Sequence, residues 1–135
     1  MREIKFRAWG KIDKKMYYDV GISEDKVFSE LPCYGGWSGM VIDIEDNLVD
    51  VMQYTGLKDK NNVEIFEGDI VECDLYGEIA IVRYSEHFMR WQLHFIGDCR
   101  NHLKQRLGVY IFDWIYPKIG IVIIGNIYQN PELID

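Results

Sequence analysis

The sequence lacks the features of secreted, membrane-bound and disulfide-stabilised proteins. Its only cysteines, Cys33, Cys73 and Cys99, are odd in number and include no C-x-x-C pair, so neither a disulfide framework nor a zinc ribbon is indicated. The first residues alternate charged and apolar and contain no secretory signal. The longest apolar run, residues 119–127, is interrupted and far shorter than the ~20 residues of a membrane helix. We therefore expect a cytoplasmic protein with reduced thiols and no membrane contact.

Positive charge is also scarce. The chain has 15 lysines and arginines against 22 aspartates and glutamates, a net charge of -7. Because general affinity for nucleic acids depends on lysine and arginine, this balance argues against generic DNA coating and makes nucleic acid an unlikely partner. The 48% hydrophobic composition supplies enough material for a core, so 135 residues predict one folded domain, 1–135.

Short segments with the two-residue period of strands occupy most of the chain, and helical periodicity is nearly absent. The predicted strands are 3–9, 16–20, 26–31, 40–44, 48–54, 70–75, 78–84, 91–96, 109–116 and 119–124. Three hairpins are expected, joining 3–9 to 16–20, 40–44 to 48–54, and 70–75 to 78–84 through Tyr76 and Gly77. Only residues 98–107 are a candidate helix.

The polar, turn-rich segment 55–62 is the predicted boundary between two subdomains. The first, residues 1–54, is expected to be an irregular β region. The second, residues 66–135, has the strand lengths of an SH3-like barrel. The prediction is thus an all-β fold of mainly antiparallel short strands, with at most one short helix.

Candidate metal ligands are few. Cys99 and His102 have ligand spacing, but a tetrahedral site needs a second pair, and His87 and His94 fit surface positions better. An acidic cluster comprises Glu64, Glu67, Asp69, Glu72 and Asp74. A solvated strand face explains this cluster better than a Mg²⁺ site, although a metal-dependent hydrolase using Glu67, Asp69 and Glu72 remains a weak alternative.

No sequence motif for a catalytic nucleophile, a phosphate-binding loop, a dinucleotide site or a zinc protease occurs. We therefore assign no catalytic residue, cofactor or metal, and expect a protein that is not an enzyme.

Two local basic patches keep a nucleic-acid role open as an alternative. One combines Lys5, Arg7, Lys11, Lys14 and Lys15 with the aromatic residues Trp9, Tyr17 and Tyr18, and the other comprises Arg100, Lys104 and Arg106. Stacking of bases on the aromatic rings would complete such a site. Solvated hairpin faces over core aromatics are the simpler interpretation.

Aromatic residues are abundant, with four tryptophans and nine tyrosines. Tryptophan and tyrosine are enriched at the centres of protein interfaces. The excess is explained equally well by core filling and by a surface for self-association or for a partner.

Three segments carry a family resemblance that covers essentially the whole chain. They are residues 2–9 (REIKFRAW) with 14–17 (KKMY), residues 52–61 (MQYTGLKDKN) with 64–71 (EIFEGDIV), and residues 124–128 (IGNIY) with 130–133 (NPEL). Together they resemble the YopX family, small proteins encoded mostly by bacteriophages and prophages. The chain departs from the family pattern at three positions: it has Gly10 where members often have aspartate, Asn62 where they often have glycine, and Phe66 where tyrosine is usual. Asn62 matters most, because asparagine adopts the left-handed backbone region less readily than glycine.

The resemblance implies a β-rich fold with a barrel-like C-terminal part and a phage or prophage origin, and it supplies no catalytic residues. Our leading hypothesis is a non-enzymatic module that binds a host or phage protein, and that forms a homo-oligomer. The candidate partner-binding residues are Trp9, Tyr54, Thr55, Asp59, Glu67 and Asp69. The second of the three segments, residues 52–61 with 64–71, is called the central motif below. A rigid connector is the favoured interpretation of it, and a binding loop is the alternative.

Overall fold

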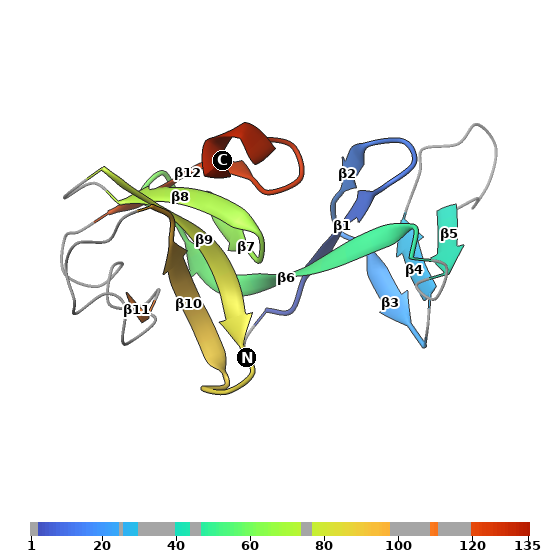
Figure 1. Ribbon diagram of the computed structural model, residues 1–135. Helices are drawn as coiled ribbons and strands as arrows, with labels where there is room; N and C mark the ends of the chain where they lie inside the picture. The colour runs from blue at the N-terminus through green and yellow to red at the C-terminus, as the bar shows by residue number, and fades with distance from the viewer. Residues whose placement is uncertain are drawn as a thin grey trace. The chain divides into compact units, whose positions relative to one another are not determined.

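The computed structural model describes residues 3–24, 26–29, 40–43, 47–73, 77–97, 109–110 and 120–135 (Figure 1). Within these ranges the chain is all-β with antiparallel pairing, as predicted, and its helical segment is the short 3₁₀ helix η1 (Pro131–Ile134). The strands are β1 (Phe6–Gly10), β2 (Lys15–Tyr17), β3 (Gly21–Ser23), β4 (Lys26–Ser29), β5 (Met40–Asp43), β6 (Val49–Lys58), β7 (Glu64–Phe66), β8 (Asp69–Cys73), β9 (Glu78–Ser85), β10 (Arg90–Phe95), β11 (Val109–Tyr110) and β12 (Ile121–Asn126). The chain divides into two compact units, Met1–Tyr54 and Thr55–Asp135.

The amino-terminal unit is built around β1, which pairs with β2 on one side and with the first half of β6 on the other. In this register Ala8 lies opposite both Tyr17 and Val51. Ala8 packs with Val20, Val27 and Val49 in a small buried cluster. A separate three-stranded sheet has the order β3-β4-β5.

The carboxy-terminal unit contains a five-stranded sheet with the order β11-β10-β9-β8-β12. Residues opposite one another in an antiparallel sheet share a face, so the register places Val71 and Ala80, and also Val82 and Leu93, on the same side. All four belong to the main core. The predicted alternation of Trp91, Leu93 and Phe95 is confirmed, because Leu93 is buried and the other two pack against the same core.

Two local predictions are wrong. Segment 55–62 was expected to be a turn-rich connection between two series of strands, but its first four residues extend β6 to Lys58, since pairing with β7 outweighs their low strand propensity. The expected hairpin between 40–44 and 48–54 does not form. β5 pairs with β4 and β6 pairs with β1, because a polar connection signals a reversal of the chain without selecting the partner strand.

The other two hairpins are confirmed by the pairing of β1 with β2 and of β8 with β9, and in the second Gly77 has the positive φ of +63° that the turn requires. The candidate helix 98–107 lies outside the described residues. No helix in the described ranges is long and apolar enough to cross a membrane.

Candidate functional site

The central motif folds into the end of β6, the strand β7 and the start of β8. Thr55 lies in β6 with its hydroxyl pointing toward the neighbouring strand, where it donates a hydrogen bond to the carbonyl of Ile65 at 2.8 Å. The same oxygen accepts the backbone N–H of Leu57 at 3.2 Å. Threonine suits this position because its branched side chain fits a strand while its hydroxyl is satisfied inside the fold.

Asp59 organises the loop that follows β6. Its Oδ1 atom accepts the backbone N–H groups of Asn61 and Val63, each at 2.9 Å, and its Oδ2 atom accepts that of Ile123 in β12 at 3.1 Å. The first two bonds are local aspartate turn contacts, and the third ties the loop to a distant strand. Lys60 adds a second tie, since its backbone N–H donates to the carbonyl of Ile121 at 3.1 Å.

Asp69 closes the turn between β7 and β8. Its Oδ2 atom accepts the backbone N–H of Phe66 at 2.8 Å, and the residue is 1% exposed. Gly68 has a φ of +81°, a conformation that glycine adopts without strain. The N–H of Gly68 donates to the carbonyl of Val82 at 2.8 Å, and the carbonyl of Gly68 accepts the N–H of Ile127 at 3.0 Å. The turn is thus held by contacts on both sides.

The remaining candidates differ in burial. Tyr54 and Trp9 are both buried in the amino-terminal unit, and the Nζ atom of Lys5 lies 5.6 Å from the centre of the Tyr54 ring. Glu67 is half-buried. Five of the six candidate residues therefore contribute to the interior, and the polar ones satisfy backbone groups there. Contact of any of the six with a partner stays a prediction.

The acidic cluster does not converge on one point. Asp69 and Glu72 are three residues apart in β8, so their side chains project from opposite faces of the strand, with Asp69 buried and Glu72 exposed. In the part of the chain that the structure describes, no three histidine, cysteine or acidic side chains come close enough to hold a metal ion. Asp74, Cys99 and His102 lie outside that part.

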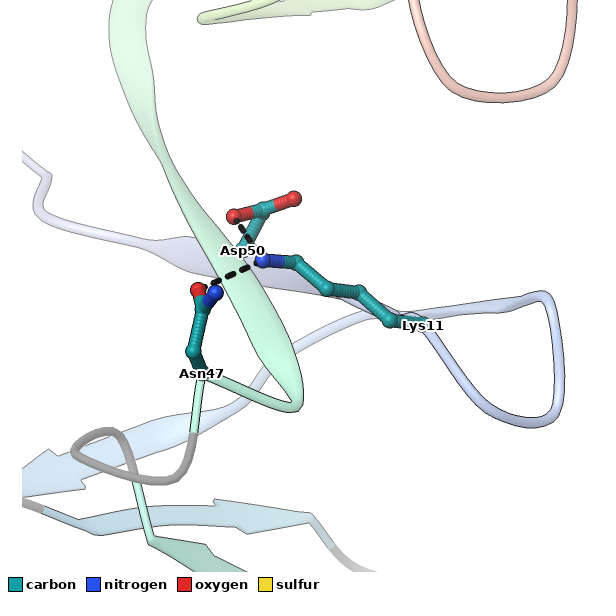
Figure 2. A network of polar contacts seen from close by, with 3 residues as sticks. All are labelled: Lys11, Asn47 and Asp50. Atoms are coloured by element: carbon teal, nitrogen blue, oxygen red, sulfur yellow. Dashed lines mark hydrogen bonds and ion pairs between the residues drawn. The ribbon is translucent and has the colours of Figure 1, made fainter.

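The basic patch near Trp9 is not assembled as expected. Arg7 was placed on a solvated face, but it is 4% exposed and lies in a stretch of β1, Arg7 to Gly10, that is buried throughout, so both faces of the strand are covered there. The side chain of Lys11 contacts residues at the start of β6. Its Nζ atom lies 2.6 Å from Oδ1 of Asn47, just before the strand, and 3.1 Å from Oδ1 of Asp50, within it (Figure 2). The second patch, Arg100 with Lys104 and Arg106, lies outside the described residues.

Sequence reasoning missed the tip of the β9–β10 hairpin, which we define as residues 83–91 and call the hairpin tip. Tyr84, Phe88 and Met89 are 40%, 47% and 74% exposed there. In the view of Figure 1 the two strands end in a turn beyond their neighbours. The available signal was a phenylalanine and a methionine inside a turn segment (YSEHFMRW), where polar residues are usual.

Contacts within the hairpin tip hold its aromatic residues in place. The rings of Tyr84 and Trp91 meet edge to face, with centroids 5.1 Å apart. The guanidinium carbon of Arg90 lies 4.6 Å from the centre of the Phe88 ring, and His87 meets the edge of that ring. The N–H of Phe88 donates to Oγ of Ser85 at 3.3 Å. These contacts define the positions of the Tyr84 and Phe88 rings on the hairpin tip.

Comparison with known proteins identifies the family. The sequence profile of the family described as YopX protein matches residues 5–135. The chain belongs to the YopX family. A similar solved structure is the crystal structure of protein EF1440 from Enterococcus faecalis, which is 27% identical, with a TM-score of 0.70 and all of both chains covered. No curated protein sequence matches the chain. The chain is therefore similar to EF1440 in fold over its whole length.

Proposed function

We propose that the protein is a non-enzymatic interaction module that acts by binding another protein molecule, either a host or phage protein or a second copy of itself. The observation that carries the proposal is the exposure of Tyr84, Phe88 and Met89 on one ordered hairpin tip. Tyrosine, tryptophan, phenylalanine, methionine and arginine are the residues enriched at protein interfaces, and the hairpin tip contains all five.

We also propose that the carboxy-terminal unit is an SH3-like barrel. Its antiparallel five-stranded sheet supports this, together with the β6–β7 connection, which bonds to β12 through Asp59 and Lys60. The bonds to Ile123 and Ile121 bring a further pair of strands to the open edge of the sheet. Closure of a small sheet in this way is typical of such barrels.

A phage or prophage origin and a cytoplasmic site of action complete the proposal. The first is supported by the three segments shared with the YopX family. The second is supported by the cysteine content, an odd number without a C-x-x-C pair, which fits a reducing compartment better than a disulfide framework.

The test is an affinity capture from host lysate with and without crosslinking, comparing the natural chain with the double variant Phe88→Asp, Met89→Asp. The single variant Ile12→Asp is the control, because Ile12 is 77% exposed on the β1–β2 turn, outside the hairpin tip. We expect a captured protein that the double variant loses and the control keeps. Capture of no protein under any condition, with no self-association, would count against the proposal.

A further inference from the structure

The two arginines of the hairpin tip project from the same side of the sheet. Val82 in β9 belongs to the main core, so its neighbour Arg83 projects from the opposite side, which we call the outer face. The register places Gln92 opposite Arg83, so Gln92 shares the outer face. Arg90 lies two residues before Gln92 in β10 and projects from the same side. The outer face therefore carries both guanidinium groups.

The outer face is open to solvent toward the end of the hairpin. Ile81, on the same face, is 4% exposed, but the residue opposite it, His94, is exposed, and so is Arg83. Arg90 and Gln92 are half-buried. Within the described residues no acidic side chain pairs with Arg83. The accessible part of this face thus begins at Arg83 and His94 and continues to the turn.

The guanidinium group of Arg90 is held in position by two neighbours. Its carbon lies 4.6 Å from the centre of the Phe88 ring. In the amide orientation that satisfies both groups, the side-chain oxygen of Gln92 accepts from Nε and Nη2 of Arg90 at 3.2 and 3.3 Å. Arginine presents planar N–H donors that match a carboxylate, and a guanidinium already held in place loses less conformational entropy on binding.

Positive charge predominates at the hairpin tip although the whole chain is acidic. Residues 83–91 contain Arg83, Arg90 and a single acidic residue, Glu86, which leaves +1 against -7 for the chain. Glu72 also projects from the outer face, but it lies opposite Ile79, about 13 Å from Arg83 along β9. Charges are screened over about 8 Å at physiological ionic strength. A short ligand at the tip therefore meets a locally positive surface, which favours an anion.

We propose that the outer face at Arg83 and Arg90, together with the exposed Phe88 and Met89, binds a short acidic segment of a partner protein in which carboxylates adjoin an apolar side chain. The inference rests on the proposed function and names the chemistry of the partner. The carboxylates meet the two arginines. The apolar side chain packs on Phe88 and Met89, which are 47% and 74% exposed.

A single-stranded nucleic acid fits the hairpin tip less well than an acidic protein segment. Stacking of a base needs an accessible ring face, and the Phe88 ring already contacts Arg90 and His87. A nucleic-acid strand would also extend beyond the tip and bring further phosphates near a chain with a net charge of -7. A short acidic segment places its few charges at the tip alone.

The first experiment selects ligands from short random peptides displayed on ribosomes. The natural full chain is the bait, and Arg83→Glu is used for counter-selection. We expect enrichment of peptides in which aspartate or glutamate flanks leucine, isoleucine or phenylalanine. Enrichment of neutral or basic peptides, or no enrichment at all, would overturn the proposal.

The second experiment measures the affinity of an enriched peptide by isothermal titration calorimetry. Arg83→Glu should weaken binding about tenfold or more, and Arg83→Gln should weaken it less, since the first variant adds a repulsive charge and the second only removes an attractive one. Lys58→Glu is the matched control, because it changes the net charge equally at an exposed position of β6, outside the hairpin tip. Equal weakening by Arg83→Glu and Lys58→Glu would contradict a local site. Circular dichroism checks that each variant is folded.

A titration with oligothymidylate in parallel distinguishes the two classes of anion. Oligothymidylate binding that Arg83→Glu abolishes, without peptide binding, would assign the outer face to nucleic acid and overturn the proposal. If the enriched peptides are neutral and only Phe88→Asp, Met89→Asp loses them, the acidic partner is wrong and the interaction module stands. If no peptide is enriched and affinity capture recovers no protein, both are wrong.

Discussion

The carboxylate of Asp59 accepts the backbone N–H of Ile123, which lies 64 residues further along the chain. This one side chain therefore connects the β6–β7 loop to the last strand of the sheet, while its other oxygen holds the loop itself through Asn61 and Val63. Asp59 belongs to the second segment of the family resemblance, residues 52–61 with 64–71. Its carboxylate thus gives that segment a structural explanation, since it holds the loop and binds β12 at the same time.

Replacing Asp59 with asparagine should destabilise the carboxy-terminal unit. An amide NH₂ in place of Oδ2 would face the N–H of Ile123, leaving two donors opposed in a 7% exposed site. We expect a loss of about 1–3 kcal/mol in the free energy of unfolding by urea denaturation, and faster hydrogen exchange at Ile123. The control is Asp19→Asn, at an exposed position; equal effects of the two variants would contradict the assignment.

The hydroxyl of Thr55 should contribute more to stability than its methyl group. Thr55→Val keeps the shape but leaves the carbonyl of Ile65 without this donor, whereas Thr55→Ser keeps the hydrogen bond. We expect Thr55→Val to cost about 1–2 kcal/mol and more than Thr55→Ser in chemical denaturation. The reverse order would indicate that strand packing dominates at this site.

Gly125 leaves room for the side chain of Asn130. A Cβ atom at position 125 would lie 2.5 Å from Oδ1 and 2.9 Å from Cβ of Asn130, whose Oδ1 accepts the N–H of Asn126 at 3.3 Å. Gly125→Ala should therefore cost about 1–3 kcal/mol. In combination with Asn130→Gly, which removes Oδ1 and Cβ, the clash disappears, so the double variant should be less destabilised than the sum of the two single variants; strict additivity in thermal unfolding would oppose this account.

Asn62 occupies a left-handed backbone conformation with a φ of +65°. Asparagine tolerates this conformation, but most other residues with a Cβ atom are destabilised by about 1 kcal/mol or more there. Asn62→Ala should therefore lower the free energy of unfolding by about 1 kcal/mol, while Asn62→Gly should change it by a few tenths at most because lower strain offsets higher unfolded-state entropy. A strong loss with glycine would show that the asparagine side chain contributes contacts of its own.

The hydrogen bond that the Tyr17 hydroxyl donates to Asp13 raises the pKa of the tyrosine, with burial and the negative charge of Asp13 adding to the effect. A raised folded-state pKa means that the folded protein binds the proton more tightly than the unfolded chain. The stabilisation is therefore complete below the unfolded pKa of about 10 and is lost as the pH rises through the folded pKa. Asp13→Asn should lower the pKa of Tyr17 in an ultraviolet titration of tyrosinate, with Tyr17→Phe identifying its signal; an unchanged curve would refute the coupling.

Local patterns in the sequence predicted the fold class because strand alternation is a local property. The β8–β9 hairpin was predictable from Gly77, and the alternation of Trp91, Leu93 and Phe95 identified the inner face of β10. Pairing over long distances was not predictable. The pairing of β6 with β1 depends on which strand reaches β1, and the burial of Arg7 depends on what covers its face of β1.

The same distinction applies to the candidate site. The sequence favoured a rigid connector for the central motif, and the local bonds from Asn61 and Val63 to Asp59 are of the kind that such a connector needs. It could not indicate the bond from Asp59 to Ile123, which joins segments far apart in the chain. The hairpin tip escaped notice because exposure of Phe88 and Met89 depends on what the rest of the fold leaves uncovered.

The two bonds from the β6–β7 loop to β12 also affect the behaviour of the protein at high concentration. An exposed strand edge offers unpaired N–H and carbonyl groups that can template the addition of strands from other molecules. Here the N–H of Ile123 is occupied by Asp59 and the carbonyl of Ile121 by the N–H of Lys60. The loop thus protects the edge of β12 against open-ended aggregation, so loss of Asp59 is expected to reduce solubility as well as stability.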